Sequence, residues 1–330
     1  MRFAQKSDVQ SVMKFIDRYW QSGHILSYDQ ELFEYMYLKK NGNLNFIIAT
    51  EISTKRDVAI LGFIATNSSC SRVSLALWQA ANDKELRALQ PGLACFRYLI
   101  EELSPKSLFC VGINVKTKAI YEFMGFSTGL MDHHFIPNHS LKEYKIIVNP
   151  PLFVNRKISR NRTCAVNRII RSSDARTTAI KLELEKYGKD IDYFCRRYID
   201  HPRFAYEVIE VLNESKLEGL LVYRRCFVNN NSCIRIIDIV GGTLCLKFAI
   251  PFLINEIIIH GDEYIDLVSW GLDKTELEQF GFVDRRKHVD CIVPDLFSPC
   301  VPLNRDVWFF SNLPDLEQFF KGDGDQDRPN

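Results

Sequence analysis

The two halves of this 330-residue chain repeat one order of predicted elements. Residues 44–51 and 58–65 predict two strands joined by a polar turn, and residues 204–212 and 217–223 predict the same hairpin again. In each half an aromatic helical segment precedes the hairpin, and a strand, a glycine turn and an apolar helix follow it. Because these features recur in one order at an offset of roughly 150 to 160 residues, we predict two copies of one fold.

A second constraint lies near the end of the first half. The apolar run 107–113 predicts a buried strand, and the short helix after it ends at Gly125. Asn114 precedes this helix, Tyr121 lies within it, and Phe126 follows the glycine. Taken alone, this segment is equally typical of a buried aromatic residue before a helix stop.

The turn before residues 91–103 predicts an anion site. Residues 71–80 predict a strand, and the next helix opens with Pro91, Gly92, Leu93 and Ala94. The first N–H groups of a helix have no partner within the helix, and the helix dipole favours negative charge there. We therefore expect a phosphate group at this turn.

These two segments, in this order, resemble the GCN5-related N-acetyltransferase (GNAT) family. The resemblance implies an α/β fold of mixed sheets with two tandem GNAT-like acyltransferase domains, the second degenerate. It implies acyl-CoA as a cosubstrate and no permanently bound cofactor. The family's phosphate pattern is kept at Gly92 and Ala94, but Leu89 stands where the family has Arg or Gln. The implied acyl-CoA contacts are Leu77, Trp78, Gln90, Gly92, Leu93 and Ala94.

The resemblance also implies a mechanism of direct attack by an amine on the thioester. Strand 71–80 would supply a backbone N–H to the developing oxyanion. Tyr121, in the same motif as Asn114, would return a proton to the CoA sulfur. His24, in the turn where the family builds its acceptor wall, is expected to act as a base or as an acceptor-side hydrogen-bond partner, because the pKa of histidine lies near working pH.

The whole order of segments, over roughly residues 1 to 310, resembles tandem-GNAT sugar N-acyltransferases of bacterial lipopolysaccharide and O-antigen biosynthesis. This implies a dTDP- or UDP-linked amino-deoxyhexose as acceptor, and acetyl-CoA or a short hydroxyacyl-CoA such as 3-hydroxybutanoyl-CoA as donor. Leu277 stands in the second half where the first half has Tyr121. We therefore expect the first half to hold the donor and the second half to hold the acceptor.

The second half carries side chains that suit such an acceptor. Arginine can donate two hydrogen bonds at once to a diphosphate. Asp238 lies in an apolar strand, where a carboxylate must be paired or must face a cleft, and a sugar amine or hydroxyl would pair with it. The predicted acceptor residues are Arg196, Arg197, Tyr198, His201, Arg224 and Asp238.

Composition argues against several other classes of protein function. A formal charge of +1 gives no basic face for nucleic acid, and the ten cysteines form no Cys-x-x-Cys or His/Cys pattern for a metal. The apolar stretch 244–259 is broken by Lys247, Pro251 and Glu256, so we expect no membrane span and a cytoplasmic protein. We predict domains at 1–149 and 150–320 with a disordered tail at 321–330, and we leave homo-oligomerisation open.

Two other functions stay open at this point. One is a tandem-GNAT aminoacyl transferase of cell-wall peptide synthesis, which would want a basic surface for tRNA. The other is a non-catalytic GNAT-like protein that binds a nucleotide sugar or CoA. The loss of Arg or Gln at Leu89 favours the second, whereas Asn114 and Tyr121 favour an enzyme.

Overall fold

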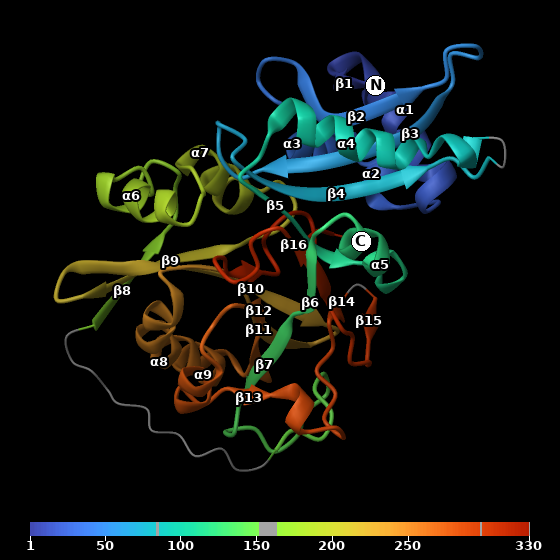
Figure 1. Ribbon diagram of the computed structural model, residues 1–330. Helices are drawn as coiled ribbons and strands as arrows, with labels where there is room; N and C mark the ends of the chain where they lie inside the picture. Colours follow the sequence, from blue (N-terminus) through green and yellow to red (C-terminus); the bar gives the residue numbers. More distant parts are fainter. Residues whose placement is uncertain (84–85, 152–163, 298, 330) are drawn as a thin grey trace. The chain divides into compact units, whose positions relative to one another are not determined.

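The computed structural model describes residues 1–83, 86–151, 164–297 and 299–329 (Figure 1). The chain forms two compact units: unit 1 comprises Met1–Cys110 with Arg328–Asn330, and unit 2 comprises Val111–Asp327. This division differs from the expected boundary at 149/150. The cause is strand β7 (Asp132–Pro137), which pairs with β12 (Tyr264–Trp270) and so carries residues of the first half into the sheet of unit 2.

Unit 1 is an antiparallel meander that ends in a parallel pair. Three of its helices lie between the first and second strands of the sheet: α1 (Val9–Phe15), α2 (Ile25–Tyr28) and α3 (Gln30–Tyr37). Its strands are β1 (Arg2–Gln5), β2 (Asn43–Thr50), β3 (Asp57–Ala65), β4 (Arg72–Ala80) and β5 (Ser107–Ile113), in that order across the sheet, and β5 continues into unit 2. Helix α4 (Pro91–Leu103) connects β4 to its parallel neighbour β5.

Helices α3 and α4 cover opposite faces of this sheet. Phe46 on β2 stacks on Phe33 of α3, with ring centroids 5.5 Å apart. On the other face, Trp78 of β4 packs on Phe96 of α4, also at 5.5 Å. Gly62 lies opposite Phe46, and a Cβ there would lie 2.8 Å from the ring. The glycine therefore makes room for the aromatic cluster under α3.

Unit 2 carries the longer sheet. Its helices are α5 (Lys118–Phe123), α6 (Thr178–Lys186), α7 (Ile191–Phe194), α8 (Gly242–His260) and α9 (Lys274–Gln279). The strand order of its main sheet is β13 (Val283–Asp284), β7, β12, β11 (Asn231–Val240), β10 (Lys216–Val228), β9 (Glu207–Asn213) and β8 (Cys164–Ile169), with β17 (Phe319–Phe320) added on β12. Strands β16 (Trp308–Ser311) and β6 (Ser127–Leu130) continue the order of the other sheet beyond β5, whereas β14 (Leu296–Phe297) and β15 (Cys300–Val301) form a separate pair.

Successive side chains of β10 point to opposite faces of this sheet and pack into the core on both. Leu221 and Tyr223 pack into the cluster under α8, whereas Leu220 and Val222 pack with α6 and α7. Among the described residues, α8 alone is long and apolar enough to cross a membrane, and 56% of that stretch is buried inside the protein. Core helices pass the same test, so α8 is adequately explained as the central helix of unit 2.

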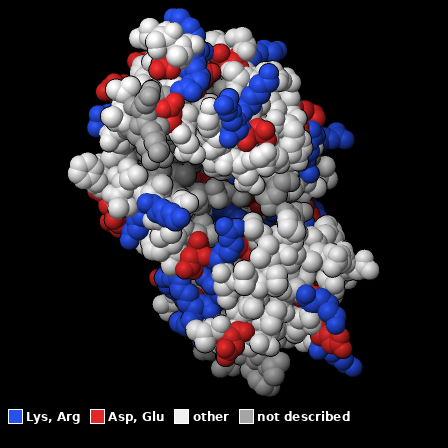
Figure 2. All heavy atoms as spheres, turned by 90° about the vertical axis from the view of Figure 1, so that its right-hand side faces the viewer, with Lys and Arg blue, Asp and Glu red and all other residues white. Residues whose placement is uncertain are grey.

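Charged side chains are arranged differently on the surface and in the interior of the protein. On the face shown in Figure 2, basic and acidic side chains lie intermixed among uncharged ones. Inside unit 2, Arg235 and Asp266 are partners across the β11–β12 ladder and are both fully buried. Their side chains form an ion pair of 2.5 Å, and His133 contacts the same carboxylate at 3.0 Å. Burial opposes ionisation of Asp266, but Arg235 and His133 together outweigh it and hold the pKa of that carboxyl below its usual value.

We expect Asp266→Asn to lower the free energy of unfolding by about 3 kcal/mol, because it leaves Arg235 buried without its main counter-charge. Urea denaturation followed by far-UV circular dichroism measures the change. Asp290→Asn, at an exposed position, is the matched control and should change the value by less than about 0.5 kcal/mol. Equal stability of the two variants would show that the ion pair is dispensable.

Candidate functional site

The strongest site feature of unit 1 is the early end of the β4–β5 ladder. Only Arg72, Val73 and Ser74 pair with β5, and the described remainder of β4 keeps its pairing to β3 alone. One extra residue then interrupts the β3–β4 register between Leu75 and Trp78, which is a β-bulge. A bulge at the rim of a sheet re-aims backbone groups. Leu77, a predicted acyl-CoA contact, lies in this bulge, within the strand 71–80 from which a backbone N–H for the oxyanion is expected.

The N-terminus of α4 lies directly over the end of β4. Trp78 donates its indole N–H to the carbonyl of Gly92 at 2.9 Å, and a Cβ on Gly92 would lie 3.1 Å from the same nitrogen. The first backbone bond of the helix runs from Ala94 N–H to Gln90. Pro91 has no N–H, so the N–H groups of Gly92 and Leu93 are the donors that this turn offers to an anion. Gln90, in a left-handed conformation, is exposed before them.

His24 is a helix cap. It is buried, its Nδ1 accepts from the N–H of Leu26 at 3.2 Å, and its ring meets Trp20 edge-on. A neutral imidazole whose Nδ1 accepts carries its proton on Nε2. Two roles are expected for His24, a general base or a hydrogen-bond partner of the acceptor. This geometry favours the hydrogen-bond partner.

Tyr121 and Asn114 belong to unit 2. Tyr121 is buried in α5 and stacks on Phe310, with centroids 4.0 Å apart. Gly125 takes the left-handed conformation that ends the helix, as predicted. Asn114 accepts from the N–H of Lys116 at 3.0 Å and caps the short turn before α5. The motif therefore folds as expected, while the chemical roles of both residues stay predictions.

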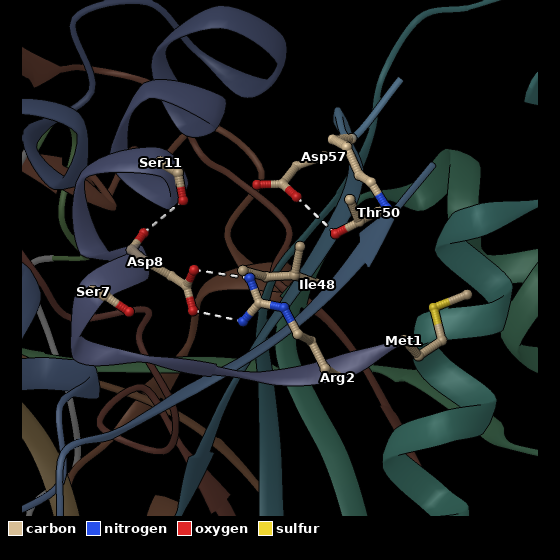
Figure 3. Close-up of a pocket in the computed structure, with 9 residues that line it drawn as sticks. Met1, Arg2, Ser7, Asp8, Ser11, Ile48, Thr50 and Asp57 are labelled. Carbon is tan, nitrogen blue, oxygen red and sulfur yellow. Dashed lines mark hydrogen bonds and ion pairs between the residues drawn. The ribbon is translucent and has the colours of Figure 1, made fainter. Parts of the chain in front are cut away.

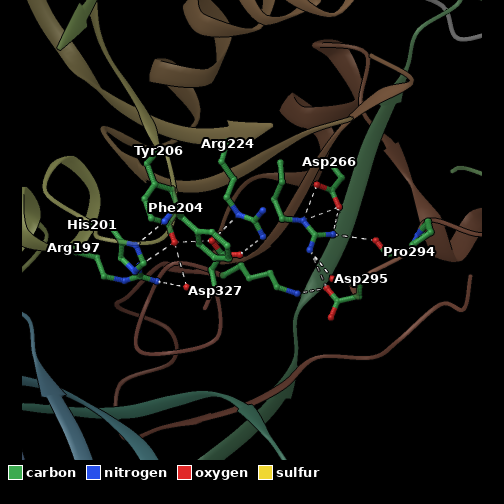
Figure 4. A network of polar contacts seen from close by, with 11 residues as sticks. Arg197, His201, Phe204, Tyr206, Arg224, Asp266, Pro294, Asp295 and Asp327 are labelled. Atoms are coloured by element: carbon green, nitrogen blue, oxygen red, sulfur yellow. Dashed lines mark hydrogen bonds and ion pairs between the residues drawn. The ribbon is translucent and has the colours of Figure 1, made fainter. Parts of the chain in front are cut away.

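The predicted acceptor residues of unit 2 converge, but on a segment of the same chain. Arg224 donates two bonds of 2.9 Å to the carboxylate of Asp327, and Arg197 donates to the backbone carbonyl of Asp327 at 3.0 Å (Figure 4). Tyr206 donates to the same carboxylate at 2.8 Å. The structure thus differs from the expected disordered tail, since Lys321, Asp323, Asp325 and Asp327 are all buried. Contacts with oppositely charged side chains order this segment, although its polar composition is typical of disordered tails.

Asp238 is paired internally rather than facing a cleft. Lys189 contacts both of its carboxylate oxygens at 2.6 Å, and Tyr198 donates to one of them at 2.8 Å. Arg235 pairs elsewhere, as the alternation of the strand predicts. The expected sugar partner of Asp238 is therefore replaced by a lysine of the chain, because a buried carboxylate needs a cation nearby.

His201 and Arg196 complete the predicted set. His201 stacks on Phe204, and burial, reinforced by Arg197, lowers its pKa to about 4. It is therefore neutral at pH 7. Arg196 is half-buried on the neighbouring turn.

Sequence reasoning missed the partners of this cluster: Lys189, Tyr206, Asp323 and Asp327. The available signal was the run Lys-Gly-Asp-Gly-Asp-Gln-Asp at 321–327, whose acids alternate and whose charge complements the arginines. Read by composition alone, it looked like a disordered tail.

A separate hollow of about 500 Å³ lies beside β1 in unit 1 (Figure 3). Both of its carboxylates accept hydrogen bonds from the lining: Arg2 donates to both carboxylate oxygens of Asp8, and Thr50 donates to Asp57. Its lining includes none of the predicted acyl-CoA residues. Within the described residues, no group of three or more His, Cys, Asp or Glu side chains is placed to hold a metal.

No family model matches this sequence, and no curated protein matches it. Solved structures, in contrast, are similar to this chain. A GCN5-related N-acetyltransferase from Anabaena variabilis is similar with a TM-score of 0.57 and 12% identity, over 93% of this chain and 71% of that one. A GCN5-related N-acetyltransferase from Kribbella flavida gives 0.55 and 14%, over 95% and 71%. At these identities the likeness shows the fold, and it confirms the predicted α/β GNAT fold.

We expect Leu93→Glu to weaken CoA binding about tenfold relative to Leu93→Gln. The two side chains have similar size, and the added carboxylate would repel a pyrophosphate at the α4 turn by about 1 kcal/mol or more. Isothermal titration of CoA into each variant gives the two dissociation constants. If they are equal, the pyrophosphate does not bind at this turn.

Proposed function

We propose that this protein is an acyl-CoA-dependent N-acyltransferase whose donor binds to unit 1. The observation that carries the proposal is the β4 bulge beside the α4 N-terminus, at the point where the parallel ladder to β5 has ended. An extended pantetheine chain can hydrogen-bond to a strand edge of this kind. The pyrophosphate would accept from the N–H groups of Gly92 and Leu93.

The reaction begins with attack of a neutral amine on the thioester carbonyl carbon. A backbone N–H at the Leu77 bulge stabilises the oxyanion that forms. Collapse of the tetrahedral intermediate breaks the carbon–sulfur bond and releases the CoA thiolate. The amine nitrogen loses one proton to solvent, and the thiolate takes up one proton, the step that the family resemblance gives to Tyr121, so that the products are an amide and CoA–SH.

The proposed acceptor is a dTDP- or UDP-linked amino-deoxyhexose, and the donor is acetyl-CoA or a short hydroxyacyl-CoA such as 3-hydroxybutanoyl-CoA. The order of segments supports this choice, and so does the convergence of Arg197 and Arg224 on one residue, Asp327, where Arg224 binds the carboxylate and Arg197 the backbone carbonyl. Asp238 is left out of the acceptor contacts because Lys189 already neutralises it.

A thiol-release assay tests the function. The protein is incubated with each acyl-CoA, a thiol reagent and a panel of nucleotide-linked amino sugars, and the same sugars without the amino group are the control. We expect CoA–SH release only with an amine acceptor. Absence of both CoA binding and amine-dependent release would contradict the proposal. CoA binding without release would favour the non-catalytic alternative.

We expect Tyr121→Phe to lower kcat by roughly one to two orders of magnitude with little change in CoA affinity. Phenylalanine preserves the stack on Phe310, so the variant removes the hydroxyl alone. Tyr28→Phe, at an exposed position, is the matched control. An effect on affinity alone, with kcat unchanged, would mean that Tyr121 acts only by packing.

A further inference from the structure

Unit 2 repeats the backbone opening of unit 1. The parallel β11–β12 ladder contains only three pairs and ends at Ile236 opposite Leu267. The β10–β11 register then shifts between Val222 and Tyr223, so that Ile237 is the extra residue. The same two irregularities follow each other at the end of β4 in unit 1. The second half has therefore kept the opening in which the proposed function seats a donor.

In unit 2 this opening is filled by the chain itself. Phe319 and Phe320 form β17, which pairs with Trp270 and Ser269 on β12 beyond the end of the ladder. Two residues later, the N–H of Gly322 donates to the carbonyl of the bulge residue Ile237 at 2.8 Å. We call Phe319–Asp327 the plug, because it bonds to both strands where they no longer bond to each other.

The plug fits closely. A Cβ on Gly322 would lie 2.6 Å from the hydroxyl of Tyr198 and 2.8 Å from the carbonyl of Ile237. Only glycine allows this approach. Acyl-CoA therefore cannot enter unit 2 while the plug is seated.

The far end of the plug is held by an anion site (Figure 4). Asp327 offers two carboxylate oxygens to the planar fork of Arg224 and accepts from Tyr206. Arg197, also buried, contacts the carbonyls of Gly322 and Asp327. Burial opposes ionisation of Asp327, but Arg224 lowers its pKa to about 2, so the carboxylate is charged at pH 7. A bidentate arginine with a tyrosine hydroxyl beside it suits phosphate oxygens equally well.

The bonds of the plug are polar for most of its length. After the two phenylalanines it consists of lysine, glycine, aspartate and glutamine. Three of its buried charges form ion pairs: Asp323 with Lys189, Asp327 with Arg224, and Lys321 with Asp295. The attraction within such a pair exceeds the free-energy cost of removing both charges from water by only a little. When the partners separate, water can solvate both of them. A ligand that replaces the carboxylate can therefore release the end of the plug.

We propose that Asp327 occupies a site for the diphosphate of the acceptor, and that binding of a diphosphate displaces the plug from Arg197 and Arg224. The choice of ligand rests on the proposed function; the displaceable plug does not. The shared chemistry is a diphosphate, which a nucleotide sugar and CoA both carry. The nucleotide is the favoured source, because the donor has its own opening in unit 1.

Titration of inorganic pyrophosphate, UDP, dTDP and CoA into the full chain tests the site. We expect Asp327→Ala to bind pyrophosphate, UDP and dTDP at least about tenfold more tightly than the native chain, since a site occupied nine-tenths of the time by its own plug loses that factor in affinity. Asp327→Asn keeps the side-chain shape and should give an intermediate gain. Asp315→Ala, exposed and just before the plug, should give none. Arg224→Ala combined with Asp327→Ala should abolish the gain.

Hydrogen exchange on the native chain supplies an independent readout. The amides of Phe320 and Gly322 both donate in the plugged state, to Asp323 and to Ile237. Saturating UDP or dTDP should speed their exchange if the plug leaves. Unchanged affinity in both Asp327 variants, or ligand binding without faster exchange, would overturn the proposal, and tightening for CoA alone would overturn the assignment to the acceptor. Because these readouts measure binding, the site can hold even if acyl transfer is absent.

Discussion

The two units depend on a parallel ladder that is only three pairs long. Strands that stop pairing leave a row of backbone N–H and C=O groups, and such groups need a partner when they are shielded from water. The adjoining bulge turns one more backbone group out of the sheet, at Leu77 in unit 1 and at Ile237 in unit 2. An opening in each sheet thus follows from the backbone alone, before side chains are considered.

The side chains around the two openings differ. In unit 1 the strand leads to the α4 turn, where Gly92 packs on Trp78 and two N–H groups remain outside the helical ladder. In unit 2 the corresponding helix begins at Gly242, and the opening beside β11 receives Gly322 of the plug. Leu277 of α9, in the place of Tyr121, is buried in the apolar cluster under α8 and offers no proton. The two units therefore share a backbone frame, and Leu277 cannot take the proton-donating role proposed for Tyr121.

The sequence predicted what repeats and what is periodic. The doubled hairpins, the strand before Asn114 and the helix stop at Gly125 depend on local patterns of apolar residues and glycine, and these patterns survive folding. It could not predict partners that lie far apart in the chain. Asp238 required a cation, but nothing local identified Lys189, and nothing in the acidic run after Phe320 identified Arg224 as its counter-charge. The bulges were equally hidden, because a one-residue register shift leaves no mark on composition.

The arginines of unit 2 explain why an acidic segment can be both buried and replaceable. Without an anion, Arg197 and Arg224 would be two like charges held close together in a largely water-free site, which is unfavourable. Some anion must therefore be present whenever the site is closed, and the plug supplies one through Asp327 at no cost in translational freedom. A diphosphate loses that entropy when it binds, but it brings more charge and more acceptor oxygens to the same donors. The balance between these two terms decides whether unit 2 is a fixed scaffold or a gated acceptor site.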